Sequence, residues 1–178
     1  TNLDDDRSNT LEAIYGSGPP GSFTLELSAL TTFAARRISH LARTDANVLT
    51  EQRALLVHQL LGGEFGLGNI SQGFDPRSIK AVDFTKATNS TPITAKLSSP
   101  EVSLGAILAG LSQQALDLNL SDPMDLVEAL ANDFADGQFN GARPLTNGRS
   151  EEILLTAIPL DRNAGTALLS AAVSSFLD

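Results

Sequence analysis

Apolar residues recur at helical spacing in five stretches of the chain, and the stretch with the fewest polar interruptions runs from Ser99 to Leu120. The serine and proline at its start favour the first turn of a helix. Because apolar side chains follow on almost every side, this helix is expected to be buried. We therefore expect it to be the central helix against which the others pack. Its apolar positions are Val102, Leu104, Ile107, Leu108 and Leu111.

Two helical stretches precede it. The first follows the capping residue Ser28 and extends to about Arg43. The second is capped by Asp45 or by Thr50 and ends at the glycine pair 62–63, which is expected to supply a left-handed stop. Because the link between the two helices is short, we expect them to form an antiparallel helical hairpin.

Two more helical stretches follow it. Ser121 or Asp122 caps the first of them, Pro123 occupies its first turn, and Gly137 ends it. Asp161 caps the last helix, which we expect to close the bundle. Its apolar residues are Leu168, Leu169, Ala172, Val173 and Phe176.

Strand-like alternation is confined to the N-terminal part of the chain. Residues 1–8 are a polar lead-in, and residues 9–28 hold two alternating stretches around the turn sequence GSGPPG, which predicts a β-hairpin. An isolated hairpin is marginally stable in water. It is therefore expected either to lean on the helices or to be the end of a preceding β domain. Residues 29–178 are expected to form the helical domain.

Two later segments break the helical pattern. The segment 64–98 is too long for an ordinary connection, and its scattered apolar residues predict one long ordered loop held across the helices. Residues 151–158 are expected to form a helical turn or two before Pro159. The fold class predicted is mainly α, a bundle of about five helices with an N-terminal β-hairpin and one long ordered loop.

Composition narrows the range of partners. The formal charge is −9, from 21 acidic and 12 basic residues, and a field of this sign repels phosphate backbones. We therefore expect no nucleic-acid partner. The chain has no cysteine, which excludes disulfides and thiolate metal sites. It has no apolar run of about 18 residues, so no membrane insertion is expected.

One turn holds the best candidates for metal ligands. Asp133, Asp136 and Asn140 lie near glycines, and carboxylate and amide oxygens of this kind are calcium ligands. The spacing does not match an EF-hand, because a bidentate glutamate would be needed where Arg143 stands. The alternative is a helix C-terminus followed by an Asn-Gly turn. No cofactor other than a possible calcium ion is expected.

No catalytic motif is present. The chain has no nucleophile elbow, no zinc-protease motif and no cysteine, and it has only two histidines. His40 is expected on the helix surface, and His58 is expected to be structural. We therefore expect that the protein is not an enzyme.

The amino-acid sequences of several segments resemble those of a known class of helical module. The segments are FTLELSALTTFAARR, FGLGNIS, LGAILAGLSQQA, LVEALANDFADGQFNG and GTALLSAAVSSFL, within residues 9–178. They resemble helical modules of long secreted or outer-surface bacterial proteins, often lipoproteins, in which such modules sit beside immunoglobulin-like repeats. The resemblance implies a secreted or cell-surface setting and a longer parent chain. It implies no particular activity, so it assigns no functional residue here.

These observations lead to two functional hypotheses. The first is a non-catalytic structural or adhesive module of a bacterial cell-surface or secreted protein, whose partners are other domains of the parent chain, a protein or a glycan. The alternative is a ligand- or calcium-binding module that uses the 64–98 loop and the 133–141 turn.

Overall fold

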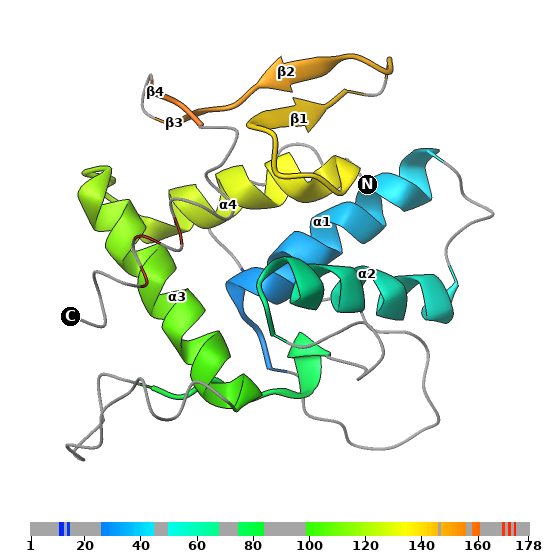
Figure 1. Cartoon of the computed structure of the whole chain (residues 1–178). Coiled ribbons are helices and arrows are strands. Elements are labelled where there is room, and N and C mark those ends of the chain that lie inside the picture. The colour runs from blue at the N-terminus through cyan, green and yellow to red at the C-terminus, as the bar shows by residue number, and fades with distance from the viewer. Residues whose placement is uncertain are drawn as a thin grey trace.

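The computed structural model describes most of the helical part of the chain. Within the described residues the fold is mainly helical, as expected (Figure 1). The described residues are 11, 12, 14, 26–44, 50–67, 75–83, 99–145, 147–155, 158–160, 169, 171 and 173. Their helices are α1 (Ala29–Thr44), α2 (Glu51–Glu64), α3 (Pro100–Asp117) and α4 (Pro123–Asp133), with the short 3-10 helices η2 (Pro76–Ser78) and η5 (Phe134–Asp136).

The helices begin where the capping residues predict. The side chain of Thr50 accepts the backbone N–H of Arg53, and Ser99 accepts that of Val102. Asp122 accepts the N–H of Met124 at 2.8 Å. Each of these bonds satisfies a backbone donor that has no partner within its own helix.

The end of α2 differs from the expectation. Gly62 and Gly63 lie inside the helix, and the left-handed residue is Gly66, with φ of 66°. The N–H of Leu67 reaches the carbonyl of Gly62 at 2.8 Å, and the N–H of Gly66 reaches that of Gly63 at 3.1 Å. This is the Schellman pattern, which places the left-handed residue after the helix rather than in it. Buried Leu67 anchors the turn.

Short strands replace the helical turns expected at residues 151–158. β1 (Ala142–Pro144) pairs antiparallel with β2 (Ser150–Glu152), and β3 (Leu154–Leu155) pairs antiparallel with β4 (Ile158–Pro159). The helical interpretation was wrong because it considered the segment alone. Residues 150–152 pair with residues 142–144, and residues 154–155 pair with residues 158–159. Pairing across a turn is not visible in helical spacing.

α1, not α3, is the helix that packs most extensively among the described elements. It contacts α2, α4 and η5, and it lies between α2 and α4 in Figure 1. The expected central helix, α3, packs against α4 along the side of this stack. The central position of α1 was not predicted from the sequence, because two of its buried residues are threonines, which are polar. The hydroxyls of Thr31 and Thr32 both donate to the carbonyl of Ser28, at 2.8 and 3.0 Å, so their burial leaves no unpaired donor.

Four phenylalanine rings join the elements around α1. Phe33 of α1 lies 6.1 Å from Phe65 and 6.0 Å from Phe139, measured between ring centroids. Phe139 also stacks on Phe134 of η5 at 4.9 Å. The rings therefore fasten the end of α2 and the segment after α4 to the same point of the core.

A single residue ties the N-terminal segment to η2. The guanidinium of Arg77 donates to the carbonyl of Ile14, and the carbonyl of Arg77 accepts the N–H of Glu26, both at 3.0 Å. Asp75 holds the guanidinium through three hydrogen bonds. Glu12 adds a backbone bond to the hydroxyl of Thr32, at 3.0 Å.

Parts of the predicted organisation lie outside the described residues. These parts are the lead-in 1–8, most of the hairpin 9–28 and most of the long loop 64–98. No strand occurs at residues 11, 12, 14 or 26–28, which are the described part of the hairpin. Of the predicted last helix only 169, 171 and 173 are described, and all three are helical. No helix in the described part of the chain is long and apolar enough to cross a membrane.

Replacing Gly110 by alanine should destabilise the protein by about 1–3 kcal/mol, even though alanine favours helices. A Cβ at Gly110 would collide with the side chain of Val173 and lie 3.2 Å from both the Val173 nitrogen and a Leu169 methyl group. The control is Gly63→Ala, at an exposed site in α2, where the helix preference should stabilise. Urea unfolding followed by circular dichroism measures both. Equal stabilisation by the two substitutions would contradict the close packing at Gly110.

Candidate functional site

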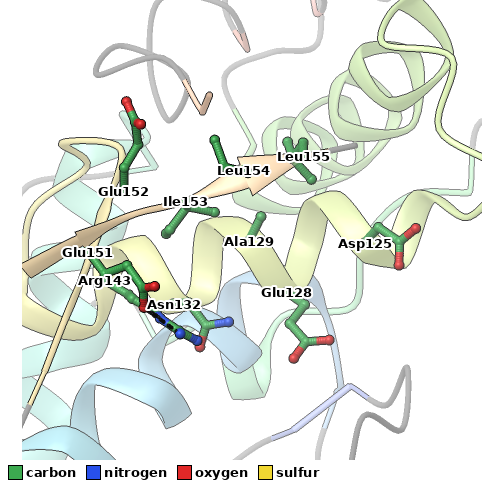
Figure 2. A pocket seen from close by; sticks show the side chains of 10 residues that line it. All are labelled: Asp125, Glu128, Ala129, Asn132, Arg143, Glu151, Glu152, Ile153, Leu154 and Leu155. Atoms are coloured by element: carbon green, nitrogen blue, oxygen red, sulfur yellow. Dashed lines mark hydrogen bonds and ion pairs between the residues drawn. The ribbon is translucent and has the colours of Figure 1, made fainter. Parts of the chain in front are cut away.

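An open pocket of about 440 Å³ lies between α4 and the chain segment that carries β2 and β3 (Figure 2). Side chains from α4 form one wall, and residues 151–155 form the other. We call this pocket the α4 groove. Its position follows from two local features, the polar face of α4 and the strand pairs that lie beside that helix.

The α4 wall of the groove is acidic. Asp125, Glu128 and Asn132 recur at helical spacing, so they share the face of α4 that points away from the core. The opposite face holds Leu126 and Leu130, both fully buried. The polar and apolar side chains of α4 therefore lie on opposite faces of the helix.

The strand wall adds the carboxylate of Glu151, whereas the side chain of Glu152 points away from α4 (Figure 2). Glu151 lies opposite Arg143 in the β1–β2 register, and its Oε2 accepts the Nε–H of Arg143 at 2.8 Å. Both side chains are about half exposed, so this ion pair contributes little to stability. Asp125, Glu128 and Glu152 form no ion pair within the described residues. The groove therefore carries more negative charge than its one arginine neutralises.

The floor of the groove is apolar. Ala129 presents a small side chain from α4, and Ile153 points toward that helix from the strand side (Figure 2). Leu155 closes the floor and is buried, whereas Leu154 at the rim is 59% exposed. An apolar floor below acidic walls favours a ligand that is both cationic and partly apolar.

The turn predicted as a metal site is organised around Asp133. This residue is completely buried, and its Oδ1 accepts the backbone N–H groups of Asn140, Gly141 and Ala142 at 2.9, 2.8 and 3.2 Å. A carboxylate that accepts several backbone donors fixes the path of the chain around it. Asp133 therefore connects the end of α4 to the start of β1.

Asp136 and Asn140 lie beside Asp133 in the same turn. Asp136 accepts the N–H of Gln138 through Oδ1 and the side-chain amide of Asn140 through Oδ2, at 2.9 and 3.3 Å. The side-chain oxygen of Asn140 accepts the N–H of Ala142 at 3.0 Å. The structure thus brings the three candidates together, with Asp133 and Asp136 before left-handed Gly137 and Asn140 after it.

Most of the oxygens in this turn already accept a hydrogen bond. The exception is Asp133 Oδ2, which is buried and has no hydrogen-bond partner. Burial raises the pKa of Asp133 above its ordinary value, although the three backbone donors oppose the shift. The described residues contain no cluster of three or more acidic, histidine or cysteine side chains placed to hold a metal. Calcium binding by Asp133, Asp136 and Asn140 stays a prediction.

The two histidines occupy different environments. His40 is partly buried on α1, and its pKa is lowered by burial and by the nearby Arg37 and Arg43. His58 is fully buried in α2, and neither of its ring nitrogens has a hydrogen-bond partner. Burial lowers the pKa of His58 to about 4, assisted by Arg77. His58 is therefore neutral and sits in the core.

Comparison of the chain with models of protein families, with curated protein sequences and with solved structures finds no match.

The α4 groove was not predicted from the sequence, which was interpreted as placing Glu151 and Glu152 at the start of a helical turn. The available signal was the charge pattern across the turn, because Arg143 and Glu151 are eight residues apart and face each other only in a hairpin.

Proposed function

We propose that this chain is a non-catalytic binding module whose α4 groove docks a basic, partly apolar segment of another polypeptide. The observation that carries this proposal is that Asp125 and Glu128, beside an apolar floor, have no ion-pair partner among the described residues. A lysine- or arginine-bearing segment would supply the missing charges, and its apolar side chains would cover Ile153 and Leu154.

The size and charge of the groove support a polypeptide occupant. Its volume of about 440 Å³ accommodates a few side chains, and its open shape allows a chain to pass through. The acidic net charge of −9 would steer a basic partner toward the protein and keep nucleic acids away. No aromatic side chain is found among the described residues that line the groove, and aromatic rings are the usual platform for sugars, so a glycan is the weaker candidate.

The chemistry of the groove also favours binding over catalysis. The described residues that line it include no histidine, serine, threonine or cysteine that could act as a nucleophile or a base near neutral pH. The buried histidine, His58, is not part of the lining. The carboxylates of the groove are suited to attracting a cation.

The resemblance of several segments to modules of bacterial surface proteins supports a cellular location for this module. We place it in a secreted or cell-surface bacterial protein, where it acts as a structural or adhesive unit. The basic segment then belongs either to another domain of the parent chain or to a separate protein.

The double variant Asp125→Asn/Glu128→Gln should weaken binding of a basic peptide by about tenfold, because each carboxylate contributes roughly 0.5–1 kcal/mol to a partly exposed charge pair. The probe is a synthetic peptide of alternating lysine and leucine, with an alternating glutamate and leucine peptide for comparison. Fluorescence anisotropy at low and high salt measures the affinity, and the difference should shrink at high salt.

The matched control is Glu51→Gln/Glu64→Gln, which removes the same charge from exposed positions of α2. This control should bind the lysine peptide almost as tightly as the unmodified protein. Equal weakening by the two double variants would mean that only net charge acts, and would contradict a groove-specific site. Absence of saturable binding of the lysine peptide would contradict the proposal as well.

A further inference from the structure

Two Asn-Gly pairs of this chain lie in opposite environments. Asn140-Gly141 belongs to the buried turn around Asp133, whereas Asn147-Gly148 belongs to the turn between β1 and β2. Asparagine followed by glycine is the dipeptide most prone to deamidation, since glycine leaves its own backbone nitrogen free of steric hindrance. The two pairs have the same intrinsic chemistry, so any difference between them comes from the fold.

The Asn147-Gly148 pair is open to solvent. Both residues are exposed, Gly148 has φ of 76°, and nothing lies within 4 Å of the position that a Cβ would occupy there. The side-chain nitrogen of Asn147, which is the leaving group, has no hydrogen-bond partner in the described part of the chain. The side chain of Asn147 is therefore exposed to water.

The turn also activates the side chain of Asn147. The backbone N–H of Arg149 donates to its Oδ1 at 3.0 Å, and Oδ1 is the oxygen that becomes negative when the amide carbon is attacked. A backbone donor aimed at a developing oxyanion lowers the barrier to such an attack. The Gly148 N–H makes a 3.2 Å bond to the carbonyl of Leu145, which is near the long end of the usual range.

The Asn140-Gly141 pair shares the donor to its side-chain oxygen, because the N–H of Ala142 donates to Asn140 Oδ1 at 3.0 Å, but it is protected at the two nitrogens that take part in the reaction. The Gly141 nitrogen is buried, and its N–H donates to Asp133 Oδ1 at 2.8 Å. Loss of that proton beside a carboxylate oxygen is unfavourable, so the nucleophile forms less often than at Gly148. The side-chain nitrogen of Asn140 is held by Asp136 at 3.3 Å, and Asn140 is only partly exposed.

We infer that Asn147 is a site of self-modification, at which the hairpin turn converts asparagine to aspartate and isoaspartate. The Gly148 nitrogen loses its proton to water or hydroxide and attacks Cγ of Asn147. The bond from Cγ to the side-chain nitrogen breaks, and ammonia leaves with a proton from solvent. Water then opens the resulting succinimide ring at one carbonyl or the other, which gives aspartate or isoaspartate without any oxidant or reductant.

The modification adds one negative charge to the β1–β2 hairpin, which takes the net charge of −9 to −10. The isoaspartate product also lengthens the backbone inside the turn. The Leu145–Arg149 backbone bond, at 2.7 Å, closes this turn, so its geometry should be disturbed. Both products alter the turn that leads into β2, the strand that carries Glu151.

The test is incubation of the folded protein at mildly alkaline pH and physiological temperature in water enriched in oxygen-18. Peptide mapping with electron-transfer fragmentation then assigns the incorporated label to individual residues and separates aspartate from isoaspartate. We expect label at Asn147 to accumulate at least about tenfold faster than at Asn140, a difference of about 1.4 kcal/mol in barrier.

The control is the same incubation in concentrated urea, where the two pairs should react at similar rates because the fold no longer distinguishes them. The variant Asn147→Ser should remove the fast phase and leave the slow reaction at Asn140 unchanged. Equal rates at the two sites in the folded protein would overturn the inference. Faster reaction at Asn140, or no reaction at Asn147, would overturn it as well.

Discussion

Replacing Asp133 by alanine should lower the free energy of unfolding by about 3 kcal/mol, because it removes the acceptor of three backbone donors at about 1 kcal/mol each. The N–H groups of Asn140, Gly141 and Ala142 would then lie near the core with no carboxylate to accept them. Urea unfolding followed by circular dichroism measures the loss. Of the substitutions in this turn, Asp133→Ala should have the largest effect.

Asp133→Asn is the informative control, since it keeps a side-chain oxygen and removes the charge. Burial raises the pKa of Asp133, so its charged form destabilises the native state as the pH rises through that pKa. The free energy of unfolding of the asparagine variant should therefore lie within about 1 kcal/mol of that of the unmodified protein at neutral pH.

Asp136→Ala should cost less than Asp133→Ala, because Asp136 accepts fewer backbone bonds. Similar losses for Asp133→Ala and Asp136→Ala would contradict the structural role of Asp133. A calcium-dependent rise in melting temperature that is lost in Asp133→Asn would instead assign these oxygens to a metal.

Acidification should destabilise the protein by about 3 kcal/mol through His58 alone. The native pKa of His58 is about 4, against an ordinary value of 6.5, so the unfolded chain binds a proton over this interval and the folded chain does not. The stability that His58 contributes is fully present above pH 6.5 and is lost as the pH falls toward 4. Urea midpoints across this range measure the slope.

His58→Leu should flatten this slope. It should also leave stability at neutral pH unchanged or higher, because it removes two buried nitrogens that have no hydrogen-bond partner. His40→Gln is the comparison, at a residue that is only partly buried, and it should retain most of the slope. A His58→Leu protein that loses as much stability on acidification as the unmodified protein would show that His58 is not the group responsible.

The sequence was most informative where a feature depends on neighbouring residues. Thr50, Ser99 and Asp122 each accept a backbone N–H that is three residues or fewer ahead in the chain. Short segments of sequence are therefore enough to predict their capping roles. The polar and apolar faces of α4 were also predictable, because they repeat every few residues. Local chemistry of this kind decides where helices begin and which side they bury.

Features that depend on distant residues were not predictable. The buried threonines of α1 look polar until the carbonyl of Ser28 is seen to accept both hydroxyls. The α4 groove exists only because the segment at 151–155 pairs with other strands and lies beside α4. The sequence identified Asp133 as notable, yet spacing alone did not reveal that its carboxylate binds backbone groups seven to nine residues ahead.

The clasp at Arg77 has a mechanical consequence. Its guanidinium binds the carbonyl of Ile14 and its own carbonyl binds the N–H of Glu26, so one residue fastens the chain on both sides of residues 15–25. Tension applied to the chain ahead of Ile14 would pass through η2 to Glu26 and then into α1. Residues 15–25 would carry little of that force until the clasp ruptures, after which they would add their contour length to the stretched chain.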